Sequence, residues 1–231
     1  VGNIINCSYK LLSQVKPDAM LVLGDTNSCL SVIPAKRLHI PIFHMEAGNR
    51  CFDECLPEET NRRIVDIISD VNMCYSEHAR RYLNASGVAK ERTYVTGSPM
   101  AEVLHQNLAE IEASDVHARL GLEKGKYILL SAHREENIDT EKNFKSLFTA
   151  INAMAEKYDM PILYSCHPRS RKRLEQSGFK LDGRVIQHEP LGFHDYNCLQ
   201  MNAFAVVSDS GTLPEESSFF TSVGHPFPAV C

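Results

Sequence analysis

The sequence predicts an α/β protein in which two parallel β-sheets are each covered by helices on both faces. Short β-type runs alternate with helix-type segments along all 231 residues, as in repeated strand–helix–strand units. Nine such runs fit two sheets better than one. A polar stretch at 109–126 contains Gly121 and Gly125 and precedes a fresh strand. The predicted domains therefore cover residues 1–113 and 114–231.

Each predicted strand is a short, mostly apolar run, and each predicted helix is a longer segment that follows or precedes one. The strands are expected at 20–23, 42–45, 72–75, 93–96, 127–131, 162–166, 184–187, 205–208 and 229–231. The helices are expected at 3–15, 28–38, 58–68, 77–86, 100–113, 141–158, 170–176, 194–202 and 214–222. Helices between successive strands act as crossovers, so the strands of each sheet should run parallel.

Composition excludes several classes of protein. A chain that is 43% hydrophobic and 23% charged can build a core, so a mainly disordered protein is excluded. No stretch approaches the roughly 18 apolar residues that a membrane span needs. The net charge of −5 gives no basic field for nucleic acid. We therefore expect a small-molecule partner and neither nucleic acid nor a membrane.

Eight cysteines are scattered through the chain. Cys51 and Cys55 form a CxxxC pair, but no second pair follows at zinc-finger spacing, so no metal is expected. Reduced thiols and the lack of a visible signal peptide favour a cytoplasmic protein. Val1 is not a start methionine and the chain closes on an apolar run, which indicates an interior piece of a longer chain with both ends missing.

Clusters of polar residues and glycines follow five predicted strands and open one helix. In open α/β sheets the functional groups lie just beyond the carboxyl ends of strands. The clusters are Gly24-Asp25-Thr26, His44 with Glu46 and Gly48, His133-Arg134-Glu135, His167-Pro168-Arg169, Asp209-Ser210-Gly211, and Pro57-Glu58-Glu59-Thr60-Asn61-Arg62. A structural protein has little reason to put so much ionisable chemistry there.

Each cluster also has a structural explanation. Asp25 can cap the next helix, and Glu58 with Glu59 can complement a helix dipole. His44 is better explained as a hydrogen-bonded core histidine. Glu46 is harder to explain this way, because a carboxylate at the end of an apolar strand needs a partner or a chemical role.

The residue types suit one kind of ligand and reaction. The turn at 210–212 before a helix has the geometry that holds a phosphate, and Arg134, His167 and Arg169 suit a diphosphate. A second set of residues suits proton transfer and the departure of a phosphate leaving group. It comprises Asp25, Glu46, Glu58 and His133. No Walker A or GxGxxG sequence follows a strand, which disfavours ATP hydrolysis and nicotinamide binding.

Seven motifs, in order, resemble those of the non-hydrolysing UDP-N-acetylglucosamine 2-epimerase family. They are GDT at 24–26, HMEAG at 44–48, PEETNR at 57–62, TGSP at 96–99, AHREEN at 132–137, CHP at 166–168 and DSGTLPEE at 209–216. The resemblance implies two Rossmann-like domains with parallel sheets, arranged as in the GT-B type with UDP in the cleft. Residues 1–113 would be a partial N-terminal domain and 114–231 a partial C-terminal, UDP-binding domain. It also implies a homodimer.

Carried over by position, the resemblance implies that Asp25, Glu46, Glu58 and His133 are catalytic. The implied substrate-binding residues are Arg134, His167, Ser210 and Gly211 on the diphosphate side, Tyr196 near the nucleoside, and Glu216 on the ribose hydroxyls. The implied reaction removes the C2 proton, expels UDP to leave a 2-acetamidoglycal, and adds UDP back while a proton returns on the other face. No metal and no redox cofactor are implied.

Two motifs depart from the usual family pattern. Most members read HRREN where this chain reads HREEN at 133–137, so Glu135 replaces an arginine. They read DSGGIQEE where this chain reads DSGTLPEE at 209–216, so Thr212-Leu213-Pro214 replaces Gly-Ile-Gln. Both changes resemble the subgroup that converts UDP-2-acetamido-2,6-dideoxy-L-talose to UDP-N-acetyl-L-fucosamine. The alternatives are an epimerase of UDP-N-acetylglucosamine to UDP-N-acetylmannosamine, a GT-B glycosyltransferase, and a non-catalytic UDP-sugar binder. Residues 1–231 alone are expected to lack turnover.

Overall fold

The computed structural model describes residues 1–132, 140–166 and 168–230. The chain divides into two compact units, Val1–Ser98 and Pro99–Cys231. The predicted residues His133, Arg134, Glu135 and His167 lie outside the described residues. The helices that the structure describes include none that is both long and apolar enough to cross a membrane.

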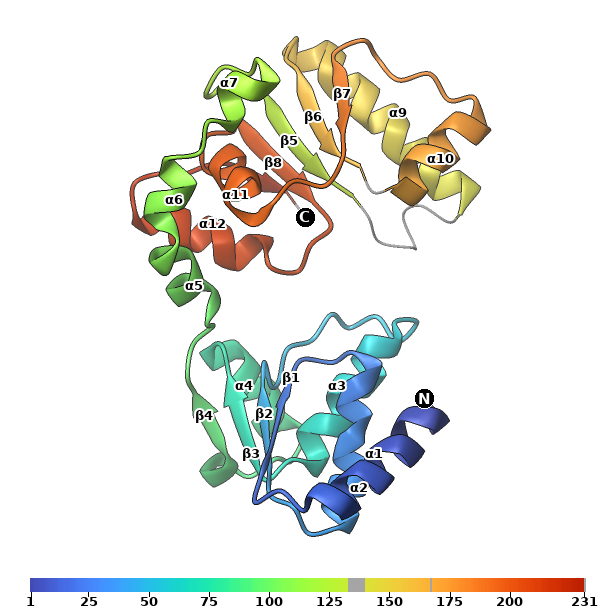
Figure 1. The fold of residues 1–231 in the computed structure, drawn as a ribbon, viewed down its shortest axis with the longest axis vertical. Coiled ribbons are helices and arrows are strands. Elements are labelled where there is room, and N and C mark those ends of the chain that lie inside the picture. Colours follow the sequence, from blue (N-terminus) through green and yellow to red (C-terminus); the bar gives the residue numbers. More distant parts are fainter. Residues whose placement is uncertain (133–139, 167, 231) are drawn as a thin grey trace. The chain divides into compact units, whose positions relative to one another are not determined.

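The first unit contains a four-stranded parallel sheet in the order β1-β2-β3-β4. Its strands are β1 (Met20–Leu23), β2 (Ile42–Met45), β3 (Val71–Cys74) and β4 (Thr93–Val95). Its helices are α1 (Gly2–Val15), α2 (Val32–Arg37), α3 (Pro57–Ile68) and α4 (Glu77–Ala85), with short 3-10 turns at Asn27–Ser31 and Lys90–Arg92. Figure 1 shows α1, α2 and α3 on one side of this sheet and α4 on the other.

Two apolar clusters hold these layers together. Val22, Ile42 and Val65 belong to the cluster under α1, α2 and α3, whereas Cys74 and Leu83 belong to the cluster under α4. All five side chains are buried. The sheet is therefore packed on both faces, as the sequence predicts for a parallel sheet.

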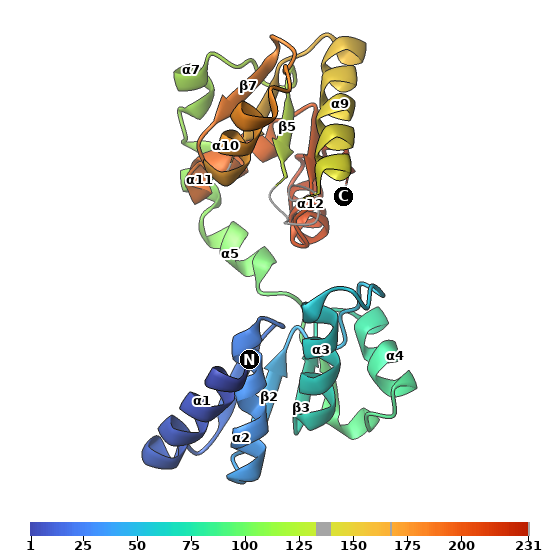
Figure 2. The same ribbon diagram turned by 90° about the vertical axis from the view of Figure 1, so that its right-hand side faces the viewer.

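The second unit contains a five-stranded parallel sheet in the order β7-β6-β5-β8-β9. Its strands are β5 (Ile128–Ser131), β6 (Ile162–Ser165), β7 (Val185–His188), β8 (Ala205–Ser208) and β9 (Ala229–Val230). Its helices are α5 (Met100–Gln106), α6 (Leu108–Glu112), α7 (Val116–Leu120), α9 (Glu141–Tyr158), α10 (Pro168–Ser177), α11 (Phe193–Met201) and α12 (Leu213–Ser222). Figure 2 shows α9 beside this sheet, on the side away from α7 and α11.

Side chains of β5 alternate between the two cores of this unit. Leu130 packs with Phe148 of α9, and Leu129 packs with Leu199 of α11 and Phe220 of α12. Helices therefore cover both faces, and the predicted fold class is confirmed. The order in which strands are added to the sheet reverses at β5: β6 and β7 lie on one side of β5, and β8 and β9 lie on the other. Ligands of open α/β sheets bind at such a switch point, beyond the carboxyl ends of the strands.

The boundary between the units differs from the predicted one at residue 113. Leu104 of α5 and Ile111 of α6 are fully buried in the same cluster as Leu199 and Phe220. These two helices therefore belong to the second unit, which begins at Pro99. The predicted helix at 100–113 is also interrupted at Asn107, whose side-chain Nδ2 donates to the Val103 carbonyl oxygen at 2.8 Å.

Candidate functional site

Asp25 and Glu46 follow neighbouring strands of the first unit. The register pairs Leu23 at the end of β1 with Met45 at the end of β2. Gly24 has φ +71°, and a Cβ atom at this position would lie 3.1 Å from Glu46 Oε2. The glycine thus lets the carboxylate of Glu46 approach the β1 backbone, and the two predicted acidic residues lie close together.

Glu46 itself adopts the left-handed conformation, with φ 67°. Such a conformation costs a non-glycine residue on the order of 1 kcal/mol and persists only where the surroundings impose it. The turn is held because Asn49 Nδ2 donates to Glu46 Oε1 at 3.2 Å. The turn also requires glycine at position 48: Gly48 has φ +79°, and a Cβ atom added there would lie 2.4 Å from the Ala79 carbonyl oxygen. The Glu46 side chain is therefore oriented by the turn and not by its strand alone.

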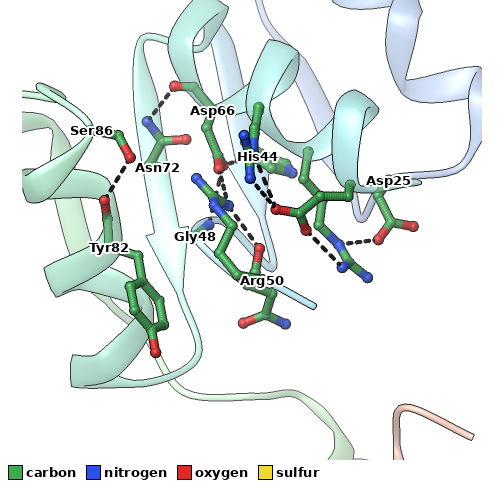
Figure 3. Close-up of polar contacts among 12 residues, drawn as sticks. Asp25, His44, Gly48, Arg50, Asp66, Asn72, Tyr82 and Ser86 are labelled. Atoms are coloured by element: carbon green, nitrogen blue, oxygen red, sulfur yellow. Dashed lines mark hydrogen bonds and ion pairs between the residues drawn. The ribbon is translucent and has the colours of Figure 1, made fainter. Parts of the chain in front are cut away.

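A buried ion-pair cluster supports the same turn. His44 Nδ1 lies 3.0 Å from Asp66 Oδ1, and Arg50 Nη1 lies 2.7 Å from Asp66 Oδ2. In Figure 3 the side chains of His44 and Arg50 both point toward the carboxylate of Asp66. His44 Nε2 also bonds to the Gly24 carbonyl oxygen at 3.2 Å. The explanation of His44 as a hydrogen-bonded core histidine is confirmed.

Arg62 of α3 reaches the strand ends. Its guanidinium pairs with the carboxylate of Asp25. Burial by itself lowers the pKa of Arg62, but the charge and hydrogen bond of Asp25, with the charges of Cys51 and Glu46, raise it overall. Asn61 Nδ2 donates to the Asp25 carbonyl oxygen at 2.9 Å, which fixes the backbone of the same residue. Arg62 Nη1 also lies 3.7 Å from Glu59 Oε2, so this permanent cation neighbours the two predicted carboxylates and a third one.

The two glutamates that open α3 differ sharply in environment. Glu58 is exposed in the first turn, beside Pro57 at the start of the helix. Glu59 is buried and accepts from Cys51 N at 3.1 Å, Cys51 Sγ at 3.3 Å and Arg63 Nε at 3.1 Å. Burial raises the pKa of Glu59, but the hydrogen bonds of Cys51 and Arg63 and the charge of Arg50 outweigh it and lower the pKa.

The structure therefore brings Asp25 and Glu46 together and places Glu58 at the exposed start of the helix that carries Arg62. Sequence reasoning did not single out Arg62 or Asp66. Arg62 ends the quoted PEETNR motif, so a signal for it was present. Asp66 gave a weaker signal, a charged residue among the apolar residues of a predicted helix.

The second unit gathers polar groups at its switch point. Ser131 at the end of β5 is paired in register with Ser208 at the end of β8. Beyond β8, Ser210 N donates to Ser208 Oγ at 3.0 Å, and Ser210 Oγ lies 3.0 Å from Thr212 Oγ1. Gly211 is exposed, and its N–H has no acceptor among the residues that the structure describes. The turn before α12 therefore offers a backbone donor at the start of a helix, where an anion is favoured.

Glu216 lies in the first turn of α12 and accepts two hydrogen bonds. Gln200 Nε2 donates to Glu216 Oε2 at 2.8 Å, and Thr212 Oγ1 donates to Glu216 Oε1 at 2.7 Å. Gln200, on α11, is completely buried, whereas Glu216 is half-buried. The carboxylate therefore has a fixed orientation at the edge of the switch point.

Tyr196 of α11 belongs to the same group. Burial raises its pKa to about 12, and the charges of Glu216 and Asp209 act in the same direction, while hydrogen bonds with Ser131 and Ser208 oppose it. The phenol is therefore a neutral group that lies between the ends of β5 and β8. Four predicted residues, Tyr196, Ser210, Gly211 and Glu216, thus lie at one edge of this sheet.

The chain resembles known proteins over nearly its whole length. The sequence pattern of the family described as UDP-N-acetylglucosamine 2-epimerase matches residues 1–223. The chain is 35% identical over 224 residues to UDP-N-acetylglucosamine 2-epimerase of Methanococcus maripaludis, covering 94% of this chain and 61% of the relative. It is 34% identical over 207 residues to UDP-2,3-diacetamido-2,3-dideoxy-D-glucuronate 2-epimerase of Pseudomonas aeruginosa, covering 89% and 57%.

Solved structures give the same picture. UDP-N-acetylglucosamine 2-epimerase of Rickettsia bellii is 45% identical with a TM-score of 0.86, and the match covers 99% of this chain and 59% of that one. The Methanocaldococcus jannaschii enzyme in complex with UDP-GlcNAc and UDP is 32% identical with a TM-score of 0.87, covering 99% and 63%. The chain spans about three fifths of the length of the curated relatives that it matches.

Proposed function

Because the chain belongs to the UDP-N-acetylglucosamine 2-epimerase family, we propose that the whole protein epimerises a UDP-N-acetylhexosamine at C2. The observation that carries this proposal is the pair of carboxylates, Asp25 and Glu46, at adjacent strand ends beside the guanidinium of Arg62. Abstraction of a carbon-bound proton needs a positioned base and a second group that can return the proton. The first unit offers groups of both kinds.

The proposed chemistry is elimination followed by addition. A carboxylate takes the proton from C2, the C1–O bond to UDP breaks, and a C1–C2 double bond forms. UDP then adds back to C1, and a proton returns to the opposite face of C2. Asp25, Glu46, Glu58 and His133 are the proposed acid–base residues. Two groups are useful here because the proton leaves one face of the sugar and arrives at the other.

The second unit is proposed to hold UDP. The N–H of Gly211, which has no acceptor among the described residues, and the hydroxyl of Ser210 suit the diphosphate, while Glu216 suits the ribose hydroxyls and Tyr196 the nucleoside. Arg134 and His167 are proposed as further diphosphate ligands on the basis of their motifs alone. We also propose a homodimer for the whole protein, which sedimentation of the purified protein tests.

The proposed substrate is UDP-2-acetamido-2,6-dideoxy-L-talose and the product UDP-N-acetyl-L-fucosamine. Glu135, Thr212 and Pro214, which depart from the usual family motifs, support this choice. The name of the Pseudomonas aeruginosa relative shows that substrates other than UDP-N-acetylglucosamine occur among similar proteins. The alternative is epimerisation of UDP-N-acetylglucosamine to UDP-N-acetylmannosamine, which the names of several relatives support.

The deciding experiment incubates the whole protein with each UDP-sugar in heavy water and follows C2 by NMR. Epimerised product should carry deuterium at C2, because the abstracted proton exchanges with solvent before another is returned. Glu58→Gln is expected to slow the re-addition and release free UDP with the glycal. The substrate that epimerises identifies the proposed reaction. Retention of the original C2 hydrogen in the product would refute the elimination mechanism.

A further inference from the structure

The Glu216 carboxylate is held by two donors from different elements, and these donors define the inference. Gln200 Nε2, on α11, donates to Oε2 at 2.8 Å. Thr212 Oγ1, immediately before α12, donates to Oε1 at 2.7 Å. Each carboxylate oxygen can accept two hydrogen bonds, so the described residues leave one acceptor position on each oxygen. Two acceptors on adjacent oxygens match a pair of hydroxyls on neighbouring carbon atoms.

The burial of Gln200 shows that its side chain is committed to this contact. Gln200 is completely buried, and its Oε1 has no hydrogen-bond partner among the described residues. A buried amide with an unsatisfied oxygen is unfavourable unless its other end makes a strong bond. The bond to a carboxylate is of the strong, charge-assisted kind, and it also fixes which end of the amide faces Glu216, because a carboxylate only accepts.

We propose that Gln200 and Thr212 are positioning residues that make Glu216 selective for the 2′,3′-diol of ribose over 2′-deoxyribose. The inference rests on the proposed UDP site and extends it to a sugar specificity. A 2′-deoxy ligand would remove water from one carboxylate oxygen and give no hydroxyl in return, and an unpaired buried acceptor is rejected strongly. Without the two donors the carboxylate can rotate and recover water, so the discrimination should weaken.

The test measures the dissociation constants of UDP and 2′-deoxy-UDP by calorimetry. In the wild-type protein UDP should bind about tenfold to a hundredfold more tightly, as expected for one hydrogen bond to a charged group. Thr212→Val and Gln200→Met, both close in size to the native residues, should each reduce that ratio at least about threefold, because they loosen but do not remove the carboxylate. Thr212→Ser keeps the hydroxyl and should restore the wild-type ratio.

Controls separate positioning from stability and from the proposed function itself. Thr221→Val removes an exposed hydroxyl from the same helix and should leave the ratio unchanged. Melting temperatures of all variants report stability. A ratio that stays at its wild-type value in Thr212→Val and Gln200→Met, whether or not the melting temperature falls, overturns the inference alone. Failure of the wild-type protein to bind UDP overturns the proposed site and the inference together.

Discussion

The guanidinium of Arg62 on α3 pairs with the carboxylate of Asp25 at the end of β1. The charge of Glu46, at the end of β2, also acts on Arg62 and helps to raise its pKa. Arg62 Nη1 also lies 3.7 Å from Glu59 Oε2, so one fixed cation serves three carboxylates that would otherwise repel one another. The ion pair restrains the Asp25 side chain and reduces the cost of keeping the negative charges together.

Arg62→Met is expected to lower kcat for C2 epimerisation by about tenfold to a hundredfold, because Asp25 loses the group that orients it. KM should change less, since the variant alters the acid–base groups and not the proposed UDP site. Arg80→Met is the matched control: Arg80 is a partly exposed arginine of α4, on the other side of the sheet, and it pairs with Glu77 of the same helix. Equal rates for the Arg62→Met and Arg80→Met proteins would contradict this role.

Glu59→Gln is expected to destabilise the protein in a pH-dependent way. The pKa of Glu59 lies below its ordinary value of 4.5 in the folded state. The ionised carboxylate therefore contributes stability above pH 4.5, and the contribution disappears as the pH falls through the folded-state pKa. Loss of its charged hydrogen bonds should cost about 2 kcal/mol at pH 7. Urea unfolding at pH 7 and at acidic pH measures both values.

Glu58→Gln provides the control for that stability measurement, because Glu58 is exposed and adjacent in sequence. Its effect on the unfolding free energy should be small at both pH values. If the deficit of Glu59→Gln relative to wild type is the same at both pH values, the ionised state of Glu59 does not provide the stabilisation.

Gly48→Ala is expected to destabilise the first unit by more than about 2 kcal/mol, because the new Cβ meets a backbone oxygen in a conformation that also disfavours alanine. The Cβ would lie 2.4 Å from the Ala79 carbonyl oxygen, at φ +79°. Gly87→Ala has a similar φ of +87° but no atom within 4 Å of the new Cβ, so it isolates the backbone cost of about 1 kcal/mol. Chemical unfolding of both variants should rank them in this order, and equal losses would disprove the predicted clash.

Thiol reactivity should divide the described cysteines into two groups. Cys7, Cys51 and Cys55 are exposed and should be alkylated by iodoacetamide at pH 8. Burial, followed by a neighbouring carboxylate, raises the pKa of Cys29 and of Cys74 to about 11. Both should stay unmodified until denaturant is added, because only the thiolate reacts. Peptide mass spectrometry of native and unfolded protein checks this division, which modification of native Cys29 or Cys74 would contradict.

The sequence by itself determined the fold class and the edge of each sheet where polar groups gather. Strand–helix alternation is a local pattern, and parallel pairing follows from crossover connections. Parallel strands end at the same edge, so Asp25 and Glu46 could be expected to lie together from the motifs that follow their strands. The core position of His44 was also predictable, because the residues on both sides of it in its strand are apolar.

Tertiary structure alone decided where the units divide and which residues hold the acidic groups. Leu104 and Ile111 give their helices an apolar side, but a sequence does not say which sheet that side will cover. Arg62 reaches Asp25 from another element, and Gln200 reaches Glu216 from the preceding helix. Such partners are set by how helices pack in three dimensions, and neither hydrophobic periodicity nor strand order carries that information.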